Sequence, residues 1–368
     1  MGRQFEFELK EQDDILNPPR FASIEGTRAL PVLIEAKAGA SNRARRNPIP
    51  VKARPPILPR DIAAEDAFRL TLLQCKWHIA ANIPTVVETR EVEGLHQMRV
   101  GFRRLRVALT SFGGDFRTPA LEALRGRAKK LSEKLGPARD LDVFVDELLE
   151  PAAEASDAHA AFDQLRARAG EARRGAWDFA IAHVSSPGFA SFMADFGEAV
   201  DRRIWFEASG RGKVTKGHIA FEMPAVDVAN RMLDHRFKHA KKRGRHLNEL
   251  SDEQRHKLRI ALKKIRYTTE FFSPFYKKED REQFHDRLTA MQSILGTLND
   301  VVVARETLQK IVDRAEQCQH CSGADVSFAA GMVYGYHLDR AHRTWSKGKK
   351  CWKALAKAEP FWHSAAVH

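Results

Sequence analysis

Two sequence blocks that recur at one fixed spacing constrain the fold of this 368-residue chain more than any other feature. The segment GLHQMRVGFRRLRVAL at 94–109 aligns without a gap with QRHKLRIALKKIRYTT at 254–269, an offset of 160 residues. The same offset aligns LGPARDLDV at 135–143 with LGTLNDVVV at 295–303. Two matched blocks in one register indicate two copies of one structural unit. We expect the copies to pack around a pseudo-two-fold axis.

Apolar residues in the first block recur at the spacing of one helix face. Met98, Phe102, Leu105 and Leu109 form such a series, which is typical of an amphipathic helix. Few prolines interrupt the sequence after Asp61, which we predict to be the N-cap of the first helix. We therefore predict an all-α protein with two pseudo-two-fold-related helical bundles around a basic channel.

The composition changes along the chain and suggests where its parts begin and end. Residues 1–36 start with the alternating, strand-like run FEFELK, and residues 37–60 hold five prolines and seven Lys/Arg but no acid. The second composition favours an extended, poorly packed linker. We expect the rest to be a helical domain at 61–357, with halves at about 61–206 and 225–357, followed by a tail at 358–368.

One face of each repeated helix carries only cationic side chains. At about 100° per residue, these stripes consist of His96, Arg99, Arg103 and Arg106 in the first copy and His256, Arg259, Lys263 and Arg266 in the second. Like charges at this spacing cost roughly 0.2–0.5 kcal/mol per pair unless something neutralises them. One interpretation is a solvated face whose carboxylate partners lie on adjacent helices. The recurrence of the stripe in one register favours a site for a polyanion.

A third cationic stripe lies within residues 229–247, and its members step by four and three residues. They are Arg231, His235, Lys238, Lys242 and Arg245. Arg125 and Lys129 are further candidates for the same lining. Three such faces predict a groove or channel for a linear polyanion, where Arg makes bidentate and Lys makes point-charge contacts with phosphate oxygens.

Each repeated stripe opens on a histidine, for which two roles remain open. His96 and His256 either donate to phosphate, since a neutral imidazole supplies one N–H, or hold Asp140 or Asp300. We expect the two aspartates to orient arginine side chains rather than to act as catalysts.

These segments resemble a known family, the CHAD domains (conserved histidine α-helical domains). LHQMRVGFRRLRVAL is similar to the family's first signature and RHKLRIALKKIRYTTEFF to its second, and the likeness runs from about Asp61 to Lys357. The resemblance implies an all-helical, two-fold-related bundle that binds inorganic polyphosphate through a basic central channel. The site residues that it implies are His96, Arg99, Arg103, Arg104, Arg106, His256, Arg259, Lys263, Lys264 and Arg266. Lys263 and Lys264 stand where the first copy has arginines, which predicts less bidentate binding there.

The N-terminal segment resembles part of a second family, the CYTH (triphosphate tunnel) domains, which often precede CHAD domains. FEFELK places Glu6, Glu8 and Lys10 at that family's ExExK spacing, and it looks equally like the last strand of such a domain. An eight-stranded tunnel would need roughly 40–80 residues in its strands alone. We therefore interpret residues 1–36 as a remnant of a CYTH domain rather than a working triphosphatase.

Other kinds of site have less support in the sequence. Cys318, Cys321, His337 and His342 formally match a zinc-finger template, but both histidines fall in one predicted helix. We expect no metal, no cofactor and no catalytic residue. No stretch approaches the roughly 18 apolar residues of a membrane span, and the N-terminus has no signal-like apolar region. Four cysteines make no disulfide framework, so we expect a reducing cytoplasm.

The sequence thus predicts a non-enzymatic protein that binds inorganic polyphosphate and resides on polyphosphate granules, where granule-associated proteins would be further partners. Two alternatives are non-specific nucleic-acid binding by the basic linker and C-terminal helix and, less favoured, hydrolysis of tripolyphosphate or polyphosphate. Residues 37–60 and 340–357 each contribute +7 to the formal net charge of +13. The rest of the chain is nearly neutral, so the sorting of cations onto helix faces indicates the site better than net charge does.

Overall fold

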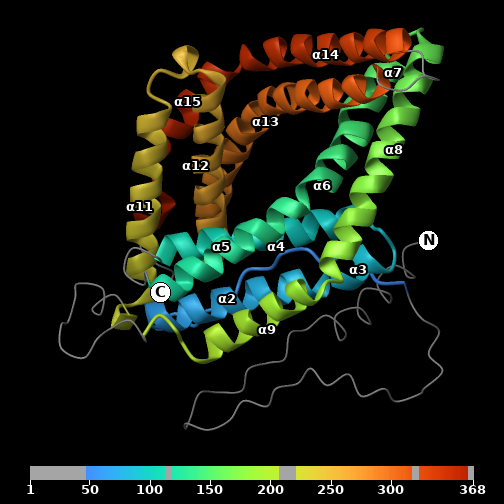
Figure 1. The fold of residues 1–368 in the computed structure, drawn as a ribbon. Helices are drawn as coiled ribbons and strands as arrows, with labels where there is room; N and C mark the ends of the chain where they lie inside the picture. Colours follow the sequence, from blue (N-terminus) through green and yellow to red (C-terminus); the bar gives the residue numbers. More distant parts are fainter. Residues whose placement is uncertain (1–46, 113–117, 207–220, 317–322, 364–368) are drawn as a thin grey trace, which may run out of the picture. The chain divides into compact units, whose positions relative to one another are not determined.

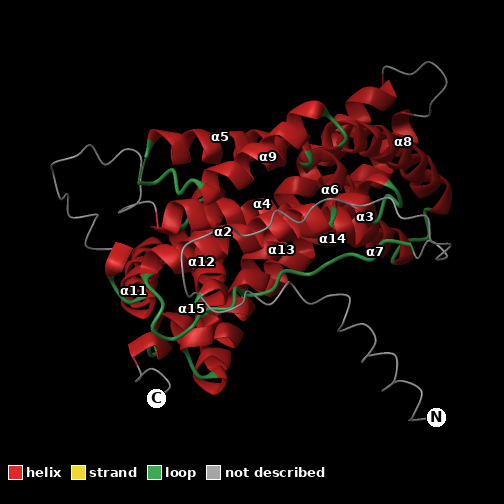
Figure 2. Ribbon diagram, turned by 90° about the horizontal axis from the view of Figure 1, so that it is seen from below, coloured by secondary structure: helices red, strands yellow, loops and turns green. Residues whose placement is uncertain are grey.

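Every regular element is a helix in the residues that the structure describes, which are 47–112, 118–206, 221–316 and 323–363 (Figure 2). The structure is a computed structural model, and its helical unit begins at Asn47. The only paired extended backbone in these residues is an isolated bridge between Ala63 and Pro224. The predicted all-α class is confirmed, while the predicted strand-like segment at 1–36 lies outside the described residues. None of the described helices has the length and apolarity needed to cross a membrane.

Four helices of the first half pack together (Figure 1). They are α2 (Ala64–Ala81), α4 (Val92–Ser111), α5 (Pro119–Lys134) and α9 (Pro187–Asp201). Helix α4 contacts both α2 and α5, and α9 contacts the same two helices. The apolar series predicted for α4 is confirmed, because Met98, Phe102, Leu105 and Leu109 are all buried. Each fully buried side chain of this size contributes about 1.5–3 kcal/mol.

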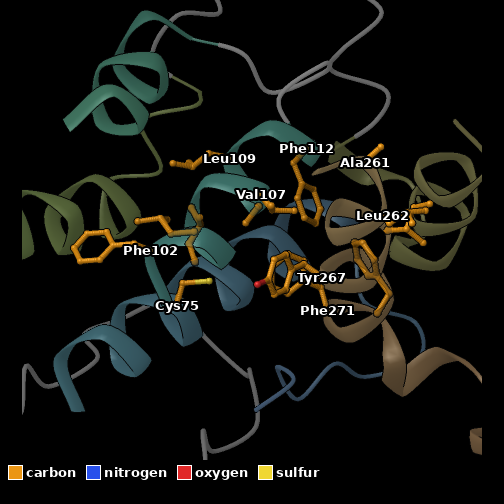
Figure 3. Packing of buried hydrophobic residues seen from close by; sticks show 14 of the residues in the cluster. Cys75, Phe102, Val107, Leu109, Phe112, Ala261, Leu262, Tyr267 and Phe271 are labelled. Atoms are coloured by element: carbon orange, nitrogen blue, oxygen red, sulfur yellow. The ribbon is translucent and has the colours of Figure 1, made fainter. Parts of the chain in front are cut away.

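Four helices of the second half form a similar group. They are α11 (Ala225–Arg243), α12 (Asp252–Phe271), α13 (Lys278–Glu316) and α15 (Gly348–Ala356). The bounds of α4 and α12 differ by 160 residues at both ends. Helices α4 and α12 touch, as do α2 and α11, so one hydrophobic core joins the groups. Figure 3 shows Phe112, which follows α4, in this core, where its ring centroid lies 5.5 Å from that of Phe272. A two-fold relation between the groups stays a prediction.

A second, smaller core lies under the remaining long helices. Helix α6 (Gly136–Val143), whose Ala138 is buried in the first core, leads into it. The elements of the second core are a π-helical turn (Phe144–Leu149), α7 (Glu150–Glu154), the first part of α8 (His159–Val184), α14 (Gly323–Trp345) and the later part of α13. The 39-residue α13 therefore serves both cores, with Phe284 buried in the first and Leu308 in the second (Figure 1). The short elements are α3 (Ile83–Val87) and the 3-10 turns Leu247–Glu249, Ser273–Phe275 and Phe361–His363.

The described part of the predicted linker, residues 47–60, is extended but packs against the helices. Val51 donates its N–H to Oδ1 of Asn82 (3.0 Å), and its carbonyl accepts from Nδ2 of Asn82 (3.0 Å). Leu58 is buried. The prediction of a poorly packed linker was wrong for these residues, because partners distant in sequence satisfy their backbone groups. The prediction that Asp61 caps the first helix was also wrong. Helix α2 begins at Ala64, whose N–H donates to the carbonyl of Met223 (2.9 Å).

The predicted tail begins with residues of the hydrophobic core. Ala358, Phe361 and Trp362 are buried, and the indole N–H of Trp362 donates to Asp234 of α11 (2.8 Å). The boundary predicted at Lys357 was therefore wrong, because the helical sequence pattern ends before the packed residues do. The domain extends at least to His363.

Replacing Phe361 by Ala should lower the free energy of unfolding by about 3–5 kcal/mol, since Phe361 is only 5% exposed and its removal leaves a cavity. Phe328 on α14 is 59% exposed, so Phe328→Ala should change stability by less than about 0.5 kcal/mol. Chemical denaturation followed by circular dichroism would measure both variants. Equal stabilities for the two would show that residues 358–363 are not part of the core.

Candidate functional site

The cationic stripes of α4 and α12 meet at Arg103. This side chain reaches from α4 to α12, where its Nη1 donates to the hydroxyl of Tyr267 (3.4 Å). Arg103 also lies close enough to Arg259 and Lys263 to lower the pKa of both groups. The fold thus brings together residues that are about 160 positions apart in the sequence.

Lys263 is the most perturbed cation of this site. Its side chain is half-buried, and burial followed by repulsion from Arg103, Arg259 and Arg266 lowers its pKa to about 7. Asp300 opposes these effects but is the weakest influence. The ammonium therefore sits among cations with little neutralising charge. A bound anion would supply that charge and favour protonated Lys263.

Arg99, near the start of α4, contacts the neighbouring helix α6. Its Nη2 lies 3.8 Å from Oδ1 of Asp140, and its Nη1 donates to the carbonyl of Ser132 (3.4 Å). Burial raises the pKa of Asp140, while the nearby cations Arg99, Arg139 and Lys310 lower it. Asp140 thus holds Arg99 in place, as predicted.

Gly136, the first residue of α6, explains how Arg99 approaches that helix so closely. A Cβ atom at this position would lie 3.1 Å from Nη1 of Arg99, a tight contact that the guanidinium would have to relieve. The aligned residue of the second block, Gly296, has open space at the same point. No side chain of the described residues therefore approaches Gly296 as closely as Arg99 approaches Gly136.

The two histidines have different surroundings. His96 is half-buried, and burial together with Arg139, Arg103 and Arg99 outweighs Glu93 and lowers its pKa to about 4. His96 is therefore neutral at pH 7 and can donate one N–H. His256 is exposed, and its Nδ1 lies 3.1 Å from Oδ1 of Asn299. The alternative in which His256 holds Asp300 was wrong, because His256 contacts Asn299, the residue before Asp300.

Arg259 carries an unused donor in the second stripe. Burial lowers the pKa of its guanidinium, and Asp300 raises it. Its Nε is buried and has no hydrogen-bond partner among the described residues. Arg266, about two turns further on, is exposed and pairs with Glu270 (2.9 Å). Arg266 thus has a carboxylate partner, whereas the Nε of Arg259 has no partner in the described part of the chain.

The structure does not place Arg104 with the other predicted ligands. Arg104 is 2% exposed and forms an ion pair with Glu270 of α12. It also donates to the carbonyl of Arg54 (3.1 Å) and lies over the ring of Phe271, 4.8 Å from its centroid. One residue along a helix turns the side chain by about 100°, so Arg104 points into the core and joins α4 to α12. Its assignment to the binding face was wrong.

The secondary candidates divide into two groups. Arg125 acts on the pKa of both Arg106 and Lys264, so these three cations lie near one another. Lys129 is exposed and pairs with Glu133 (3.5 Å), an acid that also raises the pKa of Arg106. On α11, Arg231 and His235 line a hollow together with Lys264. The other three predicted residues of that stripe do not line it; they are Lys238, Lys242 and Arg245.

Several residues near the site were not predicted from the sequence. Arg139 and Asn299 occupy matching positions in the second pair of blocks, so the 160-residue offset could have identified them. Lys310 of α13 and Tyr267 of α12 carry no sequence signal, because only the packing of the helices brings them to the site. Arg236 of α11 stands beside the predicted stripe but was not included.

The zinc template receives no support from the described residues. They contain no group of three or more His, Cys, Asp or Glu that could hold a metal ion. Cys318 and Cys321 lie outside the described residues. His337 is buried in the second core, where its Nε2 lies 2.7 Å from the carbonyl of Leu148. This contact gives His337 a structural role.

Together these features define an all-helical protein with partly desolvated cations on two matched helices. The chain belongs to the CHAD domain family, whose sequence profile matches residues 71–309. The crystal structure of the CHAD domain from the plant Ricinus communis is similar, with a TM-score of 0.71 and 27% identity over 84% of this chain and 98% of that one. PptA from Streptomyces chartreusis shares the fold at a TM-score of 0.56 and 15% identity, over 79% of this chain and all (100%) of that one. No curated protein matches the chain.

Arg104→Ala should lower the free energy of unfolding by about 3 kcal/mol, because it removes one partner of a buried ion pair. The neighbouring change Arg103→Ala should cost less than about 1 kcal/mol, since the only hydrogen bond found for Arg103 is the long one to Tyr267. Urea denaturation would measure both. A larger loss for Arg103→Ala would contradict the separate roles of these adjacent arginines.

Lys263 should also give the free protein a characteristic pH dependence. Its pKa is about 7 in the folded state and about 10.4 in an unfolded chain. The unfolded state therefore binds more protons between these values, and stability should rise as the pH rises from 7 to 10. Lys263→Met should remove this gain and be more stable than the unaltered protein at pH 7. The Tm at pH 7 and pH 9 would test this, with Lys129→Met as an exposed control; identical pH profiles for all three proteins would contradict it.

Proposed function

We propose that this protein binds inorganic polyphosphate at the cationic faces of α4 and α12. The observation that carries the proposal is Lys263, a half-buried ammonium surrounded by Arg103, Arg259 and Arg266. Buried charge is costly unless it is paired. Such a cluster is expected where a polyanion completes the pairing.

The spacing of the cations suits a linear ligand. Steps of three or four residues place successive side chains about 4.5–6 Å apart along a helix axis. A chain with a negative charge on every phosphate can meet several of them in succession, and the stripes of α4 and α12 would then hold one strand between them. Membership of the CHAD family adds support, because the family resemblance implies polyphosphate as the ligand. The channel implied by the same resemblance is part of the proposal.

The proposal is for binding without cleavage. Asp140 and Asp300, the aspartates of the second pair of blocks, each act on an arginine of a stripe, which suits positioning and charge balance. Binding of this kind would retain the protein on cytoplasmic polyphosphate granules, with other granule proteins as neighbours.

The double change Arg103→Ala/Arg259→Ala should weaken polyphosphate binding about 100-fold, since a hydrogen bond to a charged group contributes roughly 1.5–3 kcal/mol. The control Arg90→Ala/Arg127→Ala removes the same charge from exposed arginines paired with Asp178 and Asp195, and it should bind normally. Isothermal titration calorimetry with chains of defined length would measure the affinities. Equal losses in both variants would point to net charge alone and contradict the assigned site.

Salt and competitor titrations separate this proposal from its alternatives. Affinity should fall with salt in proportion to the phosphates neutralised, with the slope of about −0.7 per contact for single-stranded nucleic acid as a guide. RNA that displaces labelled polyphosphate at equal phosphate concentration would favour nucleic-acid binding. Release of orthophosphate with Mg²⁺ or Mn²⁺ would instead favour a hydrolase.

A further inference from the structure

A hollow of about 430 Å³ lies where the end of α4 meets α11 and α12. Its basic lining comes from four residues of α11 and one of α12: Arg231, His235, Arg236, His239 and Lys264. Ser111, the last residue of α4, adds a hydroxyl group. No carboxylate is among the residues that line it. The hollow therefore concentrates positive charge without an acid to balance it.

Arg236 is the most deeply placed of these cations. Its Nη1 donates to the carbonyl of Lys264 (2.7 Å), and its Nη2 donates to the hydroxyl of Ser111. Burial alone lowers the pKa of its guanidinium to about 10. These neutral partners fix the direction of the side chain but leave its charge unbalanced. A guanidinium held this way is prepared to meet an anion.

Lys264 and His239, the neighbours of Arg236, also lie among basic side chains. Burial and then Arg236, Arg243, Arg106 and Arg125 lower the pKa of Lys264. Burial lowers the pKa of His239 as well, and Arg243, His235, Lys264 and Lys242 add to the effect. The side chains that shift these two pKa values are all basic. The charge of the hollow therefore continues that of Arg106 and Arg125 on α4 and α5.

The shape of the hollow indicates which part of a phosphate chain it can accept. Phe112, Val228 and Ala261 are buried and contribute an apolar part of its lining, beneath cations that lie on exposed positions of α11 and α12. A hollow that ends on the protein core admits a chain end more readily than the middle of a chain. A terminal phosphate has a second pKa near 6 and so carries about two negative charges at pH 7. An internal phosphate of the chain carries only one.

We propose that this hollow binds a terminal phosphate group, with Arg236 and Lys264 as its charged ligands and His235 and His239 as further donors. The group would come from the end of a polyphosphate chain or from a small free phosphate such as pyrophosphate. The first source rests on the proposed function, whereas the second does not. The binding faces of α4 and α12 would then hold the length of the chain, and the hollow would hold its end.

The test compares Lys264→Gln with Lys278→Gln. Both lysines are exposed, but Lys278, the first residue of α13, does not line the hollow and belongs to none of the cationic stripes. Calorimetry would use three probes: pyrophosphate, polyphosphate of one defined length, and the same polyphosphate with both ends blocked as phosphoramidates. Lys264→Gln should weaken pyrophosphate and unblocked chains about tenfold, which corresponds to one charged contact of about 1.4 kcal/mol. It should leave blocked chains unchanged, and Lys278→Gln should leave the binding of all three probes unchanged.

Two further variants complete the design. Arg236→Gln should reproduce the losses in affinity seen with Lys264→Gln, and its Tm would show whether the variant still folds. If Arg236→Gln does not fold, Lys264→Gln still tests the proposal, because Lys264 is exposed and its replacement should not disturb the fold. Arg103→Ala should weaken blocked and unblocked chains equally.

The outcomes distinguish the two proposals. An equal effect of Lys264→Gln on blocked and unblocked chains, together with unchanged pyrophosphate binding, would overturn the inference. A loss seen with pyrophosphate alone would support a small phosphate as the ligand and overturn the chain-end source. Failure of the unaltered protein to bind either chain would overturn the proposed function, while the pyrophosphate arm would still decide whether the hollow is a phosphate site.

Discussion

The burial of one face of α4 allows its other face to carry charge that nothing within the helix neutralises. Met98, Phe102 and Leu105 are fully buried, and each such side chain contributes about 1.5–3 kcal/mol. A like-charge pair on a helix costs only about 0.2–0.5 kcal/mol. Packing therefore outweighs repulsion, and the ion pair between Arg104 and Glu270 fixes α4 against α12. The free energy gained in the core exceeds the repulsion on the cationic face, so α4 stays folded and in place without a ligand.

The helical period was enough to predict most of the cationic face of α4 but not its edge. Arg103 and Arg104 are adjacent and chemically identical, yet one lies on the site and the other is 2% exposed in the core. A period of 3.6 residues identifies the residues at the centre of each helix face. For a residue at the border between two faces, the neighbouring elements of the fold determine whether its side chain is buried or exposed. Glu270 and the carbonyl of Arg54 decide the place of Arg104, and both are distant in sequence.

Composition was less informative at the ends of the domain. Prolines and basic residues predict an extended segment at 47–60, and the segment is extended. Composition cannot show that Asn82 satisfies the backbone of Val51, or that Trp362 reaches Asp234. Such contacts depend on tertiary structure and leave no local pattern. The same reason explains why Lys310 and Tyr267 escaped notice, while Arg139 and Asn299 could have been found from the repeated blocks.

The two aligned sequence blocks differ in chemistry at Arg103 and Lys263, and this difference would affect how an anion binds between them. Arginine stays charged in proteins, whereas a buried lysine readily changes its pKa. Arg103 therefore presents a fixed charge, while its counterpart Lys263 has a pKa of about 7 and is only partly protonated at neutral pH. An anion that binds between them must raise the pKa of Lys263 and draw a proton from solvent. Lys263 would thus adjust its charge to a bound anion, with less repulsion from Arg103 when no anion is present and more attraction to the anion when it is bound.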